Sequence, residues 1–251
     1  MSTLRLNGRG NNELRPIKIE RFCNRYAEGS SFIKWGNTEV ICTATVEEKV
    51  PPFLRGLGTG WITGEYSMLP RATHQRVMRD VNKGKLNGRT SEIQRLVGRS
   101  LRAAVDMTRL GERMITIDCD VIQADGGTRT ASITAGFIAL FDSLRWLFDN
   151  ELLTEIPIKT QIAAVSVGKV GGVPMLDLCY EEDSTAEVDS NLIMTSKGDF
   201  VEFQGTGESG VFSRSELNEI LDLGWSGIKQ LHAIQRETLN LTEKENKLFE
   251  I

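Results

Sequence analysis

Apolar and polar residues alternate through segment 114–122. The apolar positions of this segment are Ile115, Ile117, Cys119 and Val121. A period of two predicts a half-buried β-strand. Apolar residues then recur at helical spacing from Ile133 to Leu147, which predicts a helix from near Arg129 to about Asn150. The ten residues QADGGTRTAS, at 123–132, therefore connect a strand to a helix.

The rest of the first half contains a hairpin and another helix. Segments 31–35 and 39–46 are rich in β-forming residues and are separated by a Gly-Asn-Thr turn, which predicts a β-hairpin. A single apolar stripe predicts a helix over 91–107. Residues 50–88 look irregular, and we expect their glycine-rich string GLGTGWITGE to form turns and close backbone contacts.

The second half has the same order of hairpins followed by a helix. We expect one hairpin from 162–167 and 175–180, and another from 191–195 and 200–204. Ser213 and Glu216 form a capping box that begins a closing helix.

These elements predict an α+β fold with two packed lobes. The expected regions are a first lobe over 1–150, a second lobe over 151–235, and a charged tail over 236–251. We expect the last dozen residues, 240–251, to be loosely held because charged chain ends rarely bury enough apolar surface.

Composition narrows the functional classes. The chain has 251 residues and a formal net charge of -4, which argues against a protein that coats nucleic acid over its whole surface. The four cysteines form no CxxC pair, so we expect buried thiols rather than a zinc ribbon or a disulfide framework. The chain lacks a membrane-length apolar run and a recognisable secretion signal, so we expect a cytoplasmic protein without a membrane partner.

The 123–132 segment has the chemistry of an anion site. Gly127, Thr128 and Arg129 should lie at a helix N-terminus, where unpaired backbone N–H groups and the helix dipole favour phosphate. An arginine adds a bidentate fork for phosphate oxygens. An ordinary strand-to-helix turn with an exposed arginine fits the same spacing.

A basic segment runs from Arg71 to Arg95. Its form is that of an exposed loop able to grip a polyanion, although a solvated loop that only aids solubility fits equally. Arg89 lies just before the predicted helix 91–107, so it can be held more rigidly than its neighbours.

An acidic segment follows the strand that we expect at 175–180. Asp183 and Asp189 could approach each other if the chain folds back or forms a helical turn. Two carboxylates suit Mg²⁺, which fills its remaining positions with water and substrate phosphate. The alternative is a solvated acidic turn. Two histidines are too few for a histidine-rich metal site, and neither has the context of a serine triad.

Taken together, these segments suggest phosphoryl or nucleotidyl transfer on nucleic acid. At this point the residues resemble the ribonuclease PH family, bacterial tRNA nucleotidyltransferases that trim RNA 3′ ends with inorganic phosphate. The resemblance extends from GRGNNELRP at 8–16 to about Trp225. It includes the motifs GWITGEYSMLPRATHQR, GRTSEIQRLVGRSLRAAVD, TIDCDVIQADGGTRTASITAGF, EEDSTAEVDSNLIMT and EFQGTGE.

The resemblance implies a role for each candidate residue. Arg89, Gly127, Thr128 and Arg129 match phosphate-binding positions. Asp183 and Asp189 match catalytic and metal-associated aspartates. The positions that match RNA-contacting arginines of the basic loop are Arg71, Arg76 and Arg79.

The resemblance also implies a fold, a reaction and an assembly. The fold is that of ribosomal protein S5 domain 2, and the family forms hexameric rings, as trimers of dimers. The reaction is phosphate-dependent 3′ to 5′ removal of nucleotides from tRNA precursors, with release of nucleoside 5′-diphosphates. A non-catalytic RNA-binding ring subunit of an exosome-like assembly, or a metal-dependent hydrolytic nuclease, are the alternatives.

Overall fold

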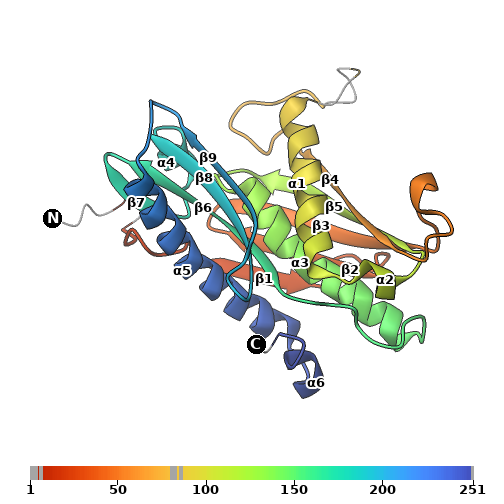
Figure 1. The fold of residues 1–251 in the computed structure, drawn as a ribbon. Helices are drawn as coiled ribbons and strands as arrows, with labels where there is room; N and C mark the ends of the chain where they lie inside the picture. The colour runs from red at the N-terminus through yellow and green to blue at the C-terminus, as the bar shows by residue number, and fades with distance from the viewer. Residues whose placement is uncertain (1–4, 6–7, 80–83, 85–86, 250–251) are drawn as a thin grey trace.

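The computed structural model describes residues 5, 8–79, 84 and 87–249. Within these residues the strands form two β-sheets, and helix α3 (Thr128–Asp149) packs against strands of both (Figure 1). Other helices flank the sheets. The predicted α+β class with two packed sheets is therefore confirmed.

The first sheet carries most of the first half of the chain. Its strand order is β1-β2-β3-β5-β4, with β4 and β5 parallel and the other neighbours antiparallel. The strands are β1 (Ile17–Arg21), β2 (Gly29–Trp35), β3 (Thr38–Glu47), β4 (Trp61–Met68) and β5 (Met114–Gln123). The predicted hairpin is β2–β3, and the predicted strand at 114–122 is β5.

The expectation of an irregular segment over 50–88 is wrong for strand β4. Besides a short 3-10 helix, η1 (Pro52–Leu54), this segment contains a strand that buries Ile62 and Tyr66. Gly64 occupies a buried position of this strand, where the alternating pattern would have an apolar residue, so the sequence did not reveal the strand. Gly64 lies where a Cβ atom would come within 2.8 Å of Val97 on helix α1, so the predicted close packing at this glycine is confirmed.

Helix α1 (Gly88–Ala104) begins earlier than the predicted helix 91–107. Asn87 is its N-cap, and the Asn87 side chain accepts a hydrogen bond from the backbone N–H of Thr90. Arg89 consequently lies inside the first turn of α1 rather than before it. A separate short helix, α2 (Met107–Leu110), follows.

The second sheet has the antiparallel order β7-β6-β8-β9. Its strands are β6 (Ile162–Val170), β7 (Val173–Leu176), β8 (Val188–Thr195) and β9 (Phe200–Gly207). The strand expected at 175–180 ends at Leu176. The chain then passes through Asp177 and enters the short helix α4 (Tyr180–Asp183).

The C-terminal region is more ordered than its charge suggests. Helix α5 (Arg214–Leu239) begins with the predicted Ser213–Glu216 capping box, and helix α6 (Glu243–Asn246) follows it. The expectation of a loosely held tail is wrong for 240–249. Phe249 is 4% exposed and packs against Phe137 and Phe141 of α3.

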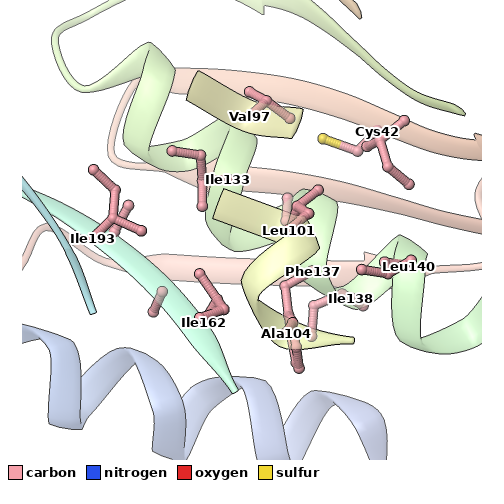
Figure 2. Close-up of a cluster of buried hydrophobic side chains, with 14 of the residues drawn as sticks. Cys42, Val97, Leu101, Ala104, Ile133, Phe137, Ile138, Leu140, Ile162 and Ile193 are labelled. Carbon is pink, nitrogen blue, oxygen red and sulfur yellow. The ribbon is translucent and has the colours of Figure 1, made fainter. Parts of the chain in front are cut away.

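A hydrophobic core joins the two sheets around α3 (Figure 2). Helix α3 is long and apolar enough to cross a membrane by length and composition, but 83% of its most apolar 18-residue window is buried inside the protein. It is therefore the central core helix. Cys42 and Cys119 are buried in this core as predicted, whereas Cys23 is exposed and Cys179 is half-buried, contrary to the prediction.

Candidate active site

Two glycines shape the turn between β5 and α3. Gly126 has a φ of 76° and Gly127 a φ of 66°, a left-handed conformation that glycine adopts without steric cost. Gly127 is the N-cap of α3, and no described side chain caps this helix end. The first backbone N–H groups of a 22-residue helix therefore remain available to an anion.

The hydroxyl of Thr128 has a partner on a distant strand. Thr128 is buried at the first position of α3, and its Oγ1 lies 2.9 Å from the hydroxyl oxygen of Tyr66 on β4. Tyr66 is itself 3% exposed. Sequence reasoning missed Tyr66 because β4 was not recognised as a strand beside β5.

Arg129 connects three elements. Its Nη1 donates a hydrogen bond to Oε1 of Gln204 on β9 at 2.9 Å and lies 3.5 Å from a carboxylate oxygen of Glu92 on α1. These contacts hold the guanidinium group beside the helix end, instead of leaving it in solvent as an ordinary strand-to-helix turn would require.

Asp183 and Asp189 come from different elements. Asp183 is the last residue of α4, and Asp189 is the second residue of β8. Burial raises the pKa of both carboxyl groups, and the negative charge of Asp183 further raises the pKa of Asp189, to about 6. The short turn over 184–187, between α4 and β8, thus brings the two predicted aspartates close enough for their charges to interact.

The arginines and the aspartates form one electrostatic unit. The charges of Arg89 and Arg129 oppose the effect of burial and pull down the pKa values of both Asp183 and Asp189. Glu208, directly after β9, acts in the opposite direction on both. Glu208 was not among the predicted residues, although it lies in the EFQGTGE motif.

The predicted RNA-contacting arginines lie after β4. Arg71, Arg76 and Arg79 are exposed. Arg79 borders a pocket of about 360 Å³ that Tyr66 also lines, and the ring of His74 lies 6.4 Å from that of Tyr180 on α4. The described part of the basic loop therefore lies beside the candidate site. Its lysines Lys83 and Lys85 fall outside the described residues.

The carboxylate oxygens of Asp183 and Asp189 are candidate ligands for a metal ion. The described residues contain no group of three or more histidine, cysteine, aspartate or glutamate side chains able to hold a metal. Mg²⁺ needs only one or two protein carboxylates when water and substrate phosphate complete its shell. The paired oxygen donors of Asp183 and Asp189 fit that requirement.

The chain matches the models of two domains of one family. Residues 13–145 match domain 1 of the 3′ exoribonuclease family, and residues 160–227 match domain 2. Both domains of the family are therefore present. Domain 1 contains the first sheet, and domain 2 contains the second sheet. The chain belongs to the 3′ exoribonuclease family, known as the RNase PH family.

Solved structures share the fold at low sequence identity. Rice (Oryza sativa) Rrp46 has a TM-score of 0.76 at 19% identity, covering 94% of this chain and 100% of its own. An Archaeoglobus fulgidus exosome with RNA bound to the active site has a TM-score of 0.76 at 22% identity, covering 92% of each chain. An archaeal exosome core has a TM-score of 0.71 at 22% identity, covering 93% of this chain and 90% of that chain.

Proposed function

We propose that this protein is a phosphate-dependent 3′ to 5′ exoribonuclease that trims the 3′ ends of tRNA precursors. Each step would release a nucleoside 5′-diphosphate, and excess nucleoside diphosphate would drive nucleotide addition. One observation carries the proposal. Arg129, at the open N-terminus of α3, donates a hydrogen bond to Gln204 on β9, the strand that pairs with the β8 strand carrying Asp189. The charges of Arg89 and Arg129 also lower the pKa values of both aspartates.

The arginines would overcome the repulsion between two anions. Inorganic phosphate would attack the last phosphodiester, so that a new bond forms to its phosphorus atom as the bond to the 3′-oxygen breaks. Arg89 and Arg129 would neutralise the attacking phosphate. Gly127 and Thr128 would fix its orientation through backbone N–H groups and a hydroxyl, so that attack is in line.

The aspartates would act on the leaving group. Asp183 and Asp189 would hold Mg²⁺, whose positive charge stabilises the leaving 3′-oxygen when the ion is bound. Alternatively, Asp189 alone would hold the ion, and Asp183, whose burial favours the protonated carboxyl group, would donate a proton to that oxygen.

The RNA would approach over the basic loop. Arg71, Arg76 and Arg79 are exposed beside α4 and would contact the RNA backbone near the site. A homohexamer, as a trimer of dimers, and a cytoplasmic location complete the proposal. The family resemblance supports the homohexamer.

A non-catalytic ring subunit is the second candidate. The chain shares its fold with exosome proteins, and the fold by itself is compatible with a ring subunit. The meeting of Arg89, Arg129, Asp183 and Asp189 favours an enzyme instead, because a subunit that only shapes a channel has no need for a phosphate site opposite paired carboxylates.

One assay separates these functions from hydrolysis. A 3′-extended tRNA is incubated with Mg²⁺, with and without inorganic phosphate, and the products are identified. Nucleoside diphosphate formed only with phosphate supports the proposal. Nucleoside monophosphate formed without phosphate indicates a hydrolytic nuclease, and intact RNA indicates a binding subunit.

A further inference from the structure

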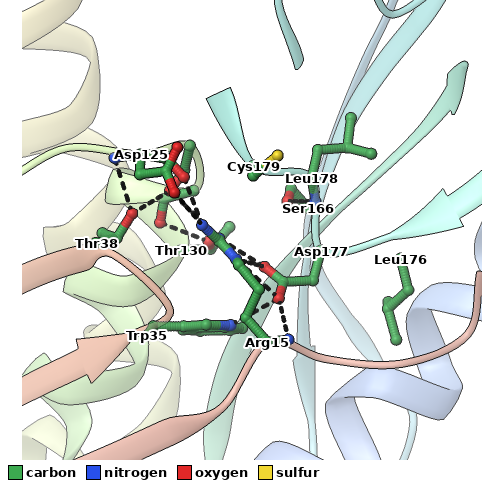
Figure 3. A network of polar contacts seen from close by, with 12 residues as sticks. Arg15, Trp35, Thr38, Asp125, Thr130, Ser166, Leu176, Asp177, Leu178 and Cys179 are labelled. Atoms are coloured by element: carbon green, nitrogen blue, oxygen red, sulfur yellow. Dashed lines mark hydrogen bonds and ion pairs between the residues drawn. The ribbon is translucent and has the colours of Figure 1, made fainter. Parts of the chain in front are cut away.

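A buried ionic network links the N-terminal segment to both halves of the candidate site (Figure 3). At its centre lies Asp177, which is 1% exposed. The Asp177 carboxylate accepts hydrogen bonds from the backbone N–H of Arg15 at 2.6 Å, from Nη2 of Arg15 at 2.7 Å and from Nε1 of Trp35 at 2.9 Å. A charge this deeply buried requires such partners.

The guanidinium group of Arg15 also reaches the glycine turn. Its Nη1 donates a hydrogen bond to the carbonyl oxygen of Asp125, and its Nη2 donates to the carbonyl oxygen of Gly126 at 3.4 Å. One planar side chain therefore holds Asp177 on one edge and the turn on another, as Figure 3 shows.

Thr38 holds the same turn from strand β3. Its hydroxyl donates to the carbonyl oxygen of Gly126 at 2.7 Å and accepts from the backbone N–H of Asp125 at 3.0 Å. Thr38 is fully buried. The backbone immediately before Gly127 is thus fixed by two side chains.

The turn and helix α4 also touch directly. The backbone N–H of Tyr180 donates to Oδ1 of Asp125 at 3.2 Å. A Cβ atom on Gly126 would lie 2.5 Å from the carbonyl oxygen of Leu178. The turn and the start of α4, the helix that carries Asp183, are therefore in direct contact.

The network also holds a strained residue. Asp177 has a φ of 56°, in the left-handed region that costs a residue with a side chain about 1 kcal/mol or more. Its surrounding hydrogen bonds impose this conformation. The result is the sharp bend that ends β7 and directs the chain into α4.

We propose that Arg15 is a positioning residue, which holds the phosphate-binding turn at 125–127 and the Asp183-bearing segment at 177–183 in register with each other. This inference rests on the proposed function. The role requires arginine. Lysine would keep the charge, but its single nitrogen cannot bond the carboxylate of Asp177 and both turn carbonyls in the same fork.

The test compares two arginine–aspartate pairs. Arg15→Lys is set against Arg21→Lys, because Arg21 makes a similar paired contact with the buried Asp142 on α3, away from the turn. Both proteins, and Thr38→Val, are checked for folding by circular dichroism. The binding of inorganic phosphate is then measured by calorimetry, and kcat and the KM for phosphate are measured with 3′-extended tRNA.

We expect Arg15→Lys to weaken phosphate binding by about tenfold or more and to lower kcat, since small misplacements of reacting groups cost this much. Arg21→Lys should leave phosphate affinity unchanged. Thr38→Val, which loosens only the turn, should weaken phosphate binding with kcat at saturating phosphate retained. General destabilisation would not lower kcat in Arg15→Lys and leave it unchanged in Thr38→Val.

Unchanged phosphate affinity in a folded Arg15→Lys protein, or an equal loss in Arg21→Lys, overturns the inference. If Arg15→Lys does not fold, Thr38→Val decides, and unchanged affinity in that variant overturns it. A wild-type protein that binds phosphate but releases no nucleoside diphosphate contradicts the proposed function alone, since the affinities still test Arg15. A wild-type protein that binds no phosphate contradicts both.

Discussion

The hydroxyl groups of Tyr66 and Thr128 lie 2.9 Å apart, on strand β4 and at the first position of helix α3. The contact orients the Thr128 hydroxyl at the helix end where we place the phosphate. Tyr66→Phe removes this hydrogen bond while keeping the ring in the core. We expect the KM for phosphate to rise by about fivefold, corresponding to about 1 kcal/mol, with stability little changed. An unaltered phosphate KM would contradict this role for Tyr66.

Arg89 and Asp183 lie on opposite sides of the proposed reaction. We expect Arg89→Ala and Asp183→Ala each to lower kcat/KM for phosphorolysis by about a hundredfold or more, because each removes charge stabilisation in a preorganised site. Neither change should prevent folding, since neither residue belongs to the hydrophobic core. Arg95→Ala on α1 and Glu181→Ala on α4 are matched controls that should keep their activity. Full activity in either site variant would refute the assignment.

The basic loop is tested by the dependence of RNA binding on salt. Arg76→Ala and Arg79→Ala should weaken binding and reduce the slope of log K against log salt by about 0.7 for each lost phosphate contact with single-stranded RNA. Arg55→Ala, which removes an exposed arginine elsewhere, should leave the slope unchanged. If the loop variants retain the wild-type affinity and slope, the loop is only a solvated surface.

His232 makes stability depend on pH. Burial, followed by the charge of Arg236, lowers the pKa of His232 to about 4, and its Nε2 has no hydrogen-bond partner among the described residues. The unfolded chain has a higher histidine pKa, so it binds a proton that the folded protein rejects. The free energy of unfolding should therefore fall by up to about 3 kcal/mol as the pH drops from about 7 to about 4.

Urea titrations across this pH range test the effect. His232→Gln should flatten the fall between about pH 6.5 and pH 4, whereas His74→Gln, at an exposed histidine, should keep it. Equal pH dependence in wild type and His232→Gln would show that another group is responsible.

Phe249 anchors the end of the chain. Phe249→Ala should lower the free energy of unfolding by about 3 kcal/mol, because it removes a buried ring from contact with α3. Phe200→Ala, at a half-exposed phenylalanine, should cost much less. Urea denaturation of both variants provides the comparison, and equal small losses would support a loosely held tail.

The pattern of apolar and polar residues predicted those elements in which apolar residues recur at regular spacing, or which begin with a recognisable cap. Strand β5, helix α3 and the Ser213–Glu216 box follow from local spacing. Strand β4 does not, because its glycine, Gly64, packs against α1, which only the folded chain brings near. The burial of Phe249 likewise depends on a partner about 110 residues earlier in the chain.

The candidate site was predictable for residues with distinctive chemistry. Arg129 and Asp183 lie in recognisable motifs, and the family resemblance paired them. Tyr66, Glu208 and Arg15 were missed because each acquires its role from a tertiary neighbour. An arginine near the N-terminus carries no signal of its contact with Asp177, which is 162 residues away.

The central claim is that inorganic phosphate is the attacking nucleophile. Radiolabelled inorganic phosphate, supplied with Mg²⁺ and unlabelled 3′-extended tRNA, tests it most directly. The label should appear in the β-phosphate of the released nucleoside 5′-diphosphate, and Arg129→Ala should abolish this transfer. Nucleotide release without incorporation of the label would contradict the claim.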